Sequence, residues 1–385
     1  MVVIVSILSI FLALFYLVLM GSYCKGWKAI PIVPENKGET KVLVSVVIPA
    51  RNEEQNITRC LDAIYQQDYP KGFFEVIVVD DHSTDSTPQT VLNYKATASW
   101  EQLQLLELKN IPNQRYKKAA ITEAIKQAKG EIIITTDADC TMGSEWLTQT
   151  IGYFTQTNAA LVSGAVVFNW EEKLYSPIKN FFLKIQQVEF AGLVGIGGAA
   201  LQLKFPNMCN GANLAYRKEV FEEVGGYMGN DNLLSGDDEF LMHKVFSRYP
   251  QQVYFNKNPK TVVKTPPSYT WGQFLGQRMR WVSKSTKYSD KRITAVLATA
   301  YLFNLTIFIN FIAAFFYPAF WWVVLFQLLS KVGIEYLLYG QILNFFNLKP
   351  LQKFIIPAQP FHILYVLLIG VLGNFGSYNW KGRKQ

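Results

Sequence analysis

Long stretches without a charged side chain lie at both ends of the sequence. They cover residues 1–24, 293–330 and 354–380. About 20 apolar residues in a helix span the hydrocarbon core of a bilayer. Residues 1–24 lack a charged leader and a small-residue cleavage site, so we expect a retained N-terminal transmembrane helix. The stretch 293–330 is too long for one span and has Pro318 near its middle, which predicts a helical hairpin.

The second arm of this hairpin is expected to reach about Tyr339. Lys331 and Glu335 lie in it four residues apart, a spacing at which two helical side chains can pair. A last apolar segment, residues 355–375, starts with two prolines and a histidine, so a third span and an interfacial helix are both open. The sequence thus predicts a C-terminal membrane region over residues 293–376 with two or three spans.

Residues 41–292 have the composition of a soluble domain, and apolar runs alternate there with helical patterns. The runs expected to be strands are 42–48, 75–79, 103–108 and 131–136. The segments expected to be helices are 56–67, 86–98 and 118–129. Continuous apolar runs are typical of strands buried on both faces, and alternation with helices predicts an α/β domain with a parallel sheet.

Acidic and polar residues follow three of the four expected strands. They are Pro49-Ala-Arg-Asn-Glu53, Asp80-Asp-His-Ser-Thr-Asp85 and Asp137-Ala-Asp139. Ligands of open parallel sheets bind beyond the carboxyl ends of the strands, so these acids are expected to converge. Clustered carboxylates repel one another, and a divalent cation with a preference for oxygen ligands, Mg²⁺ or Mn²⁺, offsets that repulsion.

Basic residues lie beside the apolar stretches. Lys25 and Lys28 follow the first stretch, and the residues before the second include Arg278, Arg280, Lys284, Lys287, Lys291 and Arg292. The positive-inside rule then predicts a multi-pass protein of the cell (inner) membrane with its domain in the cytoplasm. The formal net charge is +8, but because the positive charges gather beside membrane segments, we expect the lipid bilayer and not nucleic acid as the partner.

These residues, taken in order, resemble the family 2 glycosyltransferases of the GT-A fold, a Rossmann-like α/β fold. Within that family the chain is similar to the membrane-bound branch with ceramide glucosyltransferase and the hyaluronan, chitin and cellulose synthases. The resemblance covers about residues 42–281. Its motifs are Pro49-Ala-Arg-Asn-Glu53, Val79-Asp-Asp81, Lys117 before Ala120-Ile121, Asp137-Ala-Asp139, Asn210-Gly-Ala-Asn213, Gly236-Asp-Asp238 and Gln277-Arg-Met-Arg-Trp281.

The resemblance implies a role for each matching residue. The residues expected to bind the nucleotide-sugar donor are Pro49, Arg51, Glu53, Asp80, Asp81, Lys117, Asp137 and Asp139, the last two through the metal. Asp238 would be the general base, and Gln277, Arg280 and Trp281 would lie by the diphosphate and acceptor. Those expected on the acceptor side are Asn210, Gly211, Asn213 and Asp237. The chain departs from the family pattern at Tyr116, where relatives carry glycine, and at Asp237, where many carry glutamate.

Each motif also has a plain structural reading. The acids at 80–85, 137–139 and 236–238 could cap helices or face solvent, and the basic and aromatic segment 278–281 could anchor the chain at the membrane surface. Residues 176–200 could form an amphipathic helix on the membrane or a core helix over the sheet. The four cysteines, Cys24, Cys60, Cys140 and Cys209, fit no metal motif and would stay reduced in the cytoplasm.

We therefore expect an inverting, metal-dependent hexosyltransferase that moves a sugar from a nucleotide-sugar, by family habit a UDP-sugar, to a membrane lipid. A processive polysaccharide synthase is the alternative, although such synthases usually have more membrane spans. A transporter with a nucleotide-sensing domain would need polar side chains inside several spans, and only Lys331, Glu335 and His362 qualify. A catalytically dead binding module is disfavoured because every motif acid is present.

Overall fold

The computed structural model describes residues 2–36, 41–111, 116–229, 236–283, 290–375, 379–380 and 383–384. The chain divides into two compact units, which are described separately. The helical unit comprises Met1–Lys28, Glu171–Ile196 and Pro267–Gln385, and the sheet unit comprises Ala29–Trp170 and Gly197–Pro266. The helical unit thus includes two segments, 171–196 and 267–292, that the sequence analysis assigned to the soluble domain. Of the basic residues discussed above, Lys284 and Lys287 lie outside the described residues.

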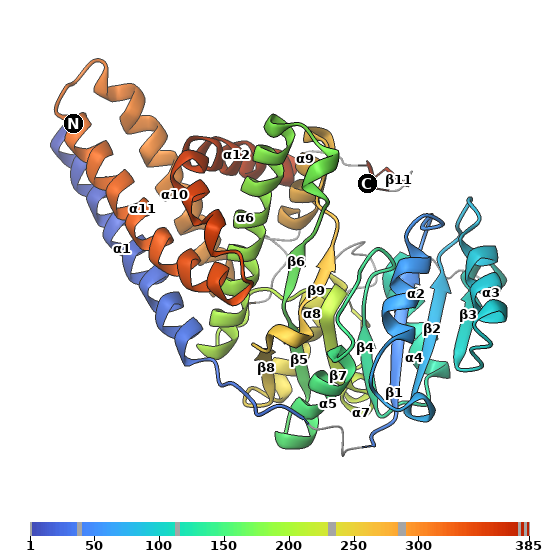
Figure 1. Ribbon diagram of the computed structural model, residues 1–385. Coiled ribbons are helices and arrows are strands. Elements are labelled where there is room, and N and C mark those ends of the chain that lie inside the picture. The colour runs from blue at the N-terminus through green and yellow to red at the C-terminus, as the bar shows by residue number, and fades with distance from the viewer. Residues whose placement is uncertain are drawn as a thin grey trace. The chain divides into compact units, whose positions relative to one another are not determined.

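A seven-stranded mixed sheet forms the centre of the sheet unit, in the order β3-β2-β1-β4-β7-β5-β8 (Figure 1). Its strands are β1 (Val44–Ala50), β2 (Phe74–Asp80), β3 (Leu103–Glu107), β4 (Ile132–Thr135), β5 (Leu161–Gly164), β7 (Leu214–Arg217) and β8 (Val253–Asn256). The first four in this order run parallel, whereas β7 runs antiparallel to both neighbours. Two further strands, β6 (Val166–Phe168) and β9 (Val263–Thr265), pair parallel to each other.

The helices of the sheet unit connect these strands. They are α2 (Ile57–Tyr65), α3 (Thr87–Thr97), α4 (Tyr116–Gln127), α5 (Trp146–Gln156), α7 (Lys218–Glu223) and α8 (Asp237–Arg248). All seven elements that the apolar patterns predict between residues 42 and 136 are present, with ends that differ by at most two residues. Strands β1 and β2 bury nearly every side chain, as expected of a parallel sheet with both faces covered.

Strand β1 continues through Pro49 to Ala50, whereas the sequence pattern suggested that Pro49 ends it. The Val47 carbonyl accepts a hydrogen bond from the Thr136 amide, so residue 47 and, two positions on, Pro49 face the β4 side of the strand. Strand β4 ends at Thr135 and has no ladder position opposite Pro49. The missing N–H of proline therefore costs no sheet hydrogen bond, which is why the strand tolerates it.

Among its described residues, the helical unit contains four helices that are long and apolar enough to cross a membrane: Val2–Ala29, Lys291–Ala314, Phe320–Phe345 and Lys349–Gly373. They correspond to α1 (Val2–Ala29), α10 (Lys291–Ala314), α11 (Phe320–Phe345) and α12 (Ile355–Phe375), the last preceded by the 3₁₀ segment η6 (Lys349–Phe354). The expected hairpin is present as α10 and α11, with Pro318 in the turn between them. The segment predicted at 176–200 forms helix α6 (Pro177–Gln202), most of which belongs to the helical unit. Helix α9 (Trp271–Val282) belongs to this unit as well.

Polar side chains join these apolar helices in the interior of the helical unit. Lys331 and Glu335 form the expected ion pair and are fully buried. The Tyr16 hydroxyl of α1 donates to Glu335 Oε1 at 2.6 Å, and Gln359 of α12 donates to Glu335 Oε2 at 2.7 Å. Since an unpaired polar group is costly in an apolar interior, this Glu335 network ties α1, α11 and α12 to one another.

Gly130 lies between α4 and β4 because β1 leaves no room for a side chain there. A Cβ atom at this position would lie 2.3 Å from the Ser45 backbone nitrogen and 2.6 Å from the Val44 carbonyl carbon. Backbone atoms of a central strand cannot move aside as a side chain would. Glycine directly after the expected helix 118–129 is therefore a packing requirement of β1.

We expect Gly130→Ala to destabilise the sheet unit by about 1–3 kcal/mol or more, the usual cost of overpacking a close-packed interior. Gly72→Ala is the matched control, because a Cβ there meets no atom within 4 Å. Thermal and urea unfolding of the two variants checks the prediction. Equal stability of the two would show that β1 does not constrain residue 130.

Candidate active site

The loops that follow β1 and β2 hold each other in place at the carboxyl edge of the sheet. Arg51 donates from one guanidinium nitrogen to the Asp81 carbonyl at 2.7 Å and to the His82 carbonyl at 2.8 Å. Asn52 Oδ1 accepts a hydrogen bond from the Thr84 amide at 2.8 Å. Asn52 and His82 both have positive φ, a conformation that short polar residues tolerate in tight turns. Arg51 thus supports the shape of the second loop.

The acids at the ends of these strands are buried. Asp80 is 1% exposed; its Oδ2 accepts from the Ser83 amide at 3.1 Å, while its buried Oδ1 has no partner among the described residues. Asp81 accepts from the Tyr116 amide at 3.3 Å. Glu53 accepts from the Asn56 amide group at 2.8 Å. These carboxylates are therefore held by short loop contacts at the edge where a nucleotide was expected.

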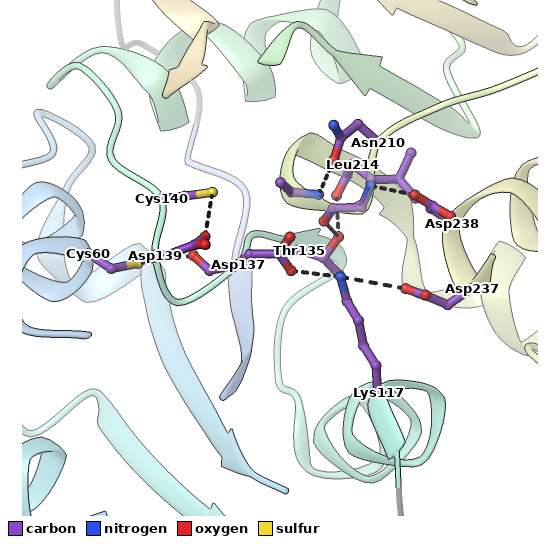
Figure 2. A network of polar contacts seen from close by, with 12 residues as sticks. Cys60, Lys117, Thr135, Asp137, Asp139, Cys140, Asn210, Leu214, Asp237 and Asp238 are labelled. Atoms are coloured by element: carbon purple, nitrogen blue, oxygen red, sulfur yellow. Dashed lines mark hydrogen bonds and ion pairs between the residues drawn. The ribbon is translucent and has the colours of Figure 1, made fainter. Parts of the chain in front are cut away.

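Tyr116, at the start of α4, has φ of 74°, in the left-handed region that favours glycine. The glycine that the family resemblance implies at this position would adopt this backbone conformation without strain. The next residue, Lys117, is thereby directed toward the strand edge, as Figure 2 shows.

The Lys117 ammonium lies between acids from two separate motifs (Figure 2). Its Nζ is 2.6 Å from Asp137 Oδ1 and 3.8 Å from Asp237 Oδ2. Asp137 follows β4, and Asp237 begins α8, so three segments far apart in the sequence meet at this cation. The structure therefore brings Asp137 together with Asp237 and the adjacent Asp238, whereas the convergence expected from the sequence concerned the acids after β1, β2 and β4.

Asp238 is oriented by backbone amides. Its Oδ2 accepts from the Gly211 amide at 2.8 Å, and its Oδ1 accepts from the Glu239 amide at 2.9 Å. A Cβ atom on Gly211 would lie 3.3 Å from Lys117 Nζ and 3.4 Å from Asp238 Cβ. Glycine at position 211 therefore leaves the room in which the lysine and the Asp238 side chain approach each other.

The two neighbouring aspartates differ in electrostatic environment. Burial raises the pKa of Asp237, and the Lys117 charge offsets only part of that rise. Burial would lower the pKa of Lys117, but the Asp137 and Asp237 carboxylates raise it above its ordinary value. Lys117 thus stays charged and neutralises part of an acidic cluster that it shares with Asp137, Asp237 and Asp238.

The Asp-x-Asp loop after β4 lies against two thiols. The Cys60 Sγ is 3.6 Å from the Asp137 carbonyl, and the Cys140 Sγ is 3.6 Å from Asp139 Oδ1. Burial, together with the Asp137 and Asp139 charges, raises the pKa of both thiols. Without a cation beside them, both thiols are therefore protonated.

The part of the chain that the structure describes has no group of three or more His, Cys, Asp or Glu side chains placed to hold a metal ion. Mg²⁺ needs no such cage, because one or two carboxylates, water and substrate phosphates complete its shell. Asp137 and Asp139, both partly exposed, supply that kind of oxygen donor. The residues present therefore fit a divalent cation that is shared with a diphosphate.

The residues expected on the acceptor side separate into two kinds. Asn210 caps the 3₁₀ turn η4 (Gly211–Asn213) by accepting from the Ala212 amide at 3.0 Å. Asn213 is buried in the core: its Nδ2 donates to the Ala165 and Thr261 carbonyls, and its Oδ1 accepts from the Trp146 indole. Asn213 thus anchors the turn, whereas Gly211 faces the acidic cluster.

The Gln277, Arg280 and Trp281 motif lies on α9, in the helical unit. Helix α9 starts with a capping box, in which Thr270 and Gln273 bond each other's backbone amides. The spacing of the motif places its first and last members four residues apart, on one face of the helix. Its residues are therefore presented together on one rigid element.

Several functional contacts were not identified from the sequence. Thr135 donates its hydroxyl to the Gly211 carbonyl at 2.7 Å, which links β4 to the η4 turn. Gly236 has φ of 81° at the N-cap of α8, so it provides the sharp turn before Asp237 and Asp238. The glycine immediately before two acids indicates this turn in the sequence. No sequence signal indicates the bond between Thr135 and Gly211, because the two residues are 76 positions apart.

Residues 45–225 match the model of the glycosyl transferase family 2 domain. This chain contains a family 2 glycosyltransferase domain. The matched residues include the acids after β1, β2 and β4 and Lys117, and they end before Asp237. The domain also has the expected fold, a GT-A-like mixed α/β sheet.

Two glycosyltransferases are similar to this chain in sequence. Glycosyltransferase AglE from Haloferax volcanii is 30% identical over 200 residues, which cover 52% of this chain and 60% of AglE. A beta-monoglucosyldiacylglycerol synthase from Nostoc sp. is 25% identical over 238 residues, which cover 62% of this chain and 48% of that protein. The chain thus spans between about half and three fifths of the length of these relatives.

A solved structure shares the fold. The mannosyltransferase PcManGT from Pyrobaculum calidifontis, in complex with GDP-Man and Mn²⁺, aligns with a TM-score of 0.58 and 19% sequence identity. The alignment covers 94% of this chain and 98% of that one. At this identity the likeness concerns the fold of the family 2 domain.

We expect Lys117→Met to lower the stability of the sheet unit by about 1–3 kcal/mol at neutral pH, because it leaves the Asp137 and Asp237 charges uncompensated. The range is below that of a fully buried pair, since the Asp137 side chain is 39% exposed. Without the Lys117 charge, the pKa of Asp237, which burial already raises, rises further, so the folded variant binds a proton that the unfolded chain releases. Its deficit should therefore grow as the pH rises through the raised pKa and shrink in acid.

Unfolding of both proteins by urea at several pH values tests this. Lys126→Met is the control, because the Lys126 side chain is 63% exposed and pairs with Glu123 on the same helix at i, i+3. A deficit of Lys117→Met that is independent of pH would contradict the electrostatic explanation.

Proposed function

We propose that this protein is an inverting hexosyltransferase that moves a sugar from a nucleotide-sugar donor, expected to be a UDP-sugar, to a membrane lipid at the cytoplasmic face. The observation that carries the proposal is the meeting of Asp137, Asp237 and Asp238 around Lys117 at the carboxyl edge of the sheet. A sugar transfer needs both a site for a diphosphate and a carboxylate base. The cluster offers carboxylates for both tasks within one small volume.

The donor would lie along the ends of β1, β2 and β4. Asp80, Asp81 and Glu53 are suited to the base and ribose, because their carboxylates accept hydrogen bonds and are already ordered. Arg51 would act by holding the loop of Asp81, and Pro49 lies in β1 beyond its last pairing position with β4, where the strand still pairs with β2. A divalent cation held by Asp139 and Asp137 would offset the charge of the leaving diphosphate. The Mn²⁺ and GDP-Man bound by PcManGT are consistent with this arrangement.

Asp238 is our candidate for the general base. The Gly211 and Glu239 amides fix its carboxylate, so the group is oriented before an acceptor arrives. It would take the proton of the acceptor hydroxyl while that oxygen bonds to the anomeric carbon and the bond from this carbon to the diphosphate breaks. One displacement of this kind inverts the anomeric centre. Asp237 is the rival, with a raised pKa but with Lys117 beside it.

The acceptor would be a lipid at the membrane. Four helices are long and apolar enough to cross a bilayer, and one relative is by name a synthase of a glucosylated diacylglycerol. Gln277, Arg280 and Trp281 are proposed to contact the diphosphate and acceptor, with Asn210 and Gly211 on the acceptor side. Lys25 and Lys28, near the carboxyl end of α1, favour a cytoplasmic catalytic domain in the cell membrane.

Purified protein in detergent should release nucleoside diphosphate from one member of a panel of nucleotide-sugars, and faster with lipid extract than without. Chelator should abolish release, and Mg²⁺ or Mn²⁺ should restore it, because the diphosphate needs a cation beside Asp139. Asp139→Asn should lose both donor binding in calorimetry and turnover. Transfer that continues unchanged in chelator would refute the metal role, and no release from any donor would refute the transferase.

Asp238→Asn keeps the size of the side chain but removes the basic carboxylate. We expect transfer to slow by about 10²–10⁴-fold, the usual contribution of a general base, while donor binding stays near the wild-type value. Asp237→Asn is the matched comparison, since it is adjacent and chemically identical. A near-normal rate for Asp238→Asn beside an inactive Asp237→Asn would transfer the base role to Asp237.

A further inference from the structure

Arg278 is the second residue of the Gln277–Trp281 motif, and it is buried. Only 3% of its surface is exposed, which is rare for an arginine on a helix that begins at a domain surface. Its guanidinium carbon lies 4.6 Å from the Phe274 ring centre and 4.3 Å from the Trp281 ring centre. The planar cation thus contacts an aromatic ring from the turn before it and another from the turn after it.

Glu189 of α6 pairs with this arginine from outside α9. Glu189 Oε1 accepts from Arg278 Nε at 3.2 Å, and its Oε2 accepts from a terminal guanidinium nitrogen. The Tyr365 hydroxyl of α12 donates to Glu189 Oε1 at 2.6 Å, so the carboxylate is itself held on a third helix. The pair is bidentate, and its geometry fixes the guanidinium plane.

Gln277 contacts the terminal nitrogen of the Arg278 guanidinium that Glu189 does not bond. Arg278 donates from its other terminal nitrogen to Gln277 Oε1 at 2.6 Å. A guanidinium has no acceptor, so the Gln277 atom that faces it must be the amide oxygen. With its oxygen fixed in this way, the amide of Gln277 presents its NH₂ group in one direction, as a hydrogen-bond donor.

We propose that Glu189 and Arg278 are positioning residues, a clamp that holds the Trp281 ring and turns Gln277 so that it donates a hydrogen bond to substrate oxygen. The inference rests on the proposed function, in which Gln277 and Trp281 meet the diphosphate and acceptor. An NH₂ donor suits a phosphate or hydroxyl oxygen, whereas an amide oxygen would repel the phosphate. Removal of either clamp residue would then misplace both motif side chains.

The clamp differs from an ordinary buried ion pair in what it touches. The same unit contains a close match: Glu335 pairs with Lys331 and also accepts from a tyrosine hydroxyl, that of Tyr16. Both glutamates are buried. In the part of the chain that the structure describes, Glu335 bonds Lys331, Tyr16 and Gln359 and no residue of the motif. Glu335→Gln therefore removes a comparable interaction without touching Gln277 or Trp281.

We expect Glu189→Gln and Arg278→Lys to lower kcat by about 10–100-fold, the cost of a small misplacement, with KM for the nucleotide-sugar changed by less than about threefold. Glu335→Gln should lower the melting temperature similarly but keep kcat within about twofold. Gln277→Glu retains the acceptor for Arg278 and removes the donor, so it should fold and lose kcat as Arg278→Lys does. In Gln277→Ala, adding Glu189→Gln should cost less than it does in the wild type, because the part of its effect that acts through Gln277 is already lost and only the part through Trp281 remains.

A measurement that does not depend on enzyme activity tests whether the clamp holds the Trp281 ring. In protein labelled with 5-fluorotryptophan, the ¹⁹F resonance of Trp281 is identified by its loss in Trp281→Phe. It should be one narrow line in the wild type and in Glu335→Gln, and shift or broaden in Glu189→Gln and Arg278→Lys.

The outcomes separate the two proposals. An unperturbed Trp281 resonance in both clamp variants overturns the inference whatever the activity. An active wild type with equal kcat losses in Glu189→Gln and Glu335→Gln also overturns it, since the role would then be structural alone. A wild type that releases no nucleotide refutes the transferase, and with it the substrate-directed part of the clamp.

Discussion

The site depends on keeping carboxylates from separate parts of the chain close together. Asp137 and Asp237 would repel each other at the edge of the sheet without a positive charge between them, and the Lys117 ammonium supplies it at 2.6 Å and 3.8 Å. Burial of Asp237 strengthens the interaction, whereas the Lys117 and Asp137 side chains are partly exposed, at 23% and 39%. It joins the loop after β4, the start of α4 and the start of α8, so the conformation of each segment depends on the other two. A diphosphate with its cation would enter a site whose charges are already arranged.

Buried charges are also compensated by opposite charges in the helical unit. Glu189 with Arg278 and Glu335 with Lys331 are each acid–base pairs closed by a tyrosine hydroxyl from another helix. Such pairs add little net stability compared with apolar packing, but breaking one leaves a buried charge and is costly. They therefore specify which helices meet and in what register, where apolar side chains alone would allow slippage.

The amino-acid pattern predicts the first half of the sheet closely and the second half poorly. Runs such as 42–48 and 75–79 are continuous and apolar, and each is followed by a turn, so period and length identify the strands. Strand β7 is only four residues long, runs antiparallel, and pairs with β5, about 50 residues earlier. Nothing local marks that pairing, since it depends on contacts formed only when the chain has folded.

The candidate site shows the same division. Asp137, Asp238 and Lys117 are found from motif order, and the structure brings their segments together. The orientation of each group is set by partners without a motif: the Gly211 amide for Asp238, and Glu189 for Arg278. Residues that bear chemistry are recognisable by type, whereas those that orient them contribute a backbone amide or one ordinary side chain from a distant element.

The Asn213 side chain has a consequence for the cost of binding. By bonding the Ala165 and Thr261 carbonyls and the Trp146 indole, it fastens the η4 turn into the core, two residues from the Gly211 amide that holds Asp238. A turn tethered in this way has already lost its conformational entropy during folding. An arriving acceptor therefore does not have to order it, and more of its contact energy is left to favour association.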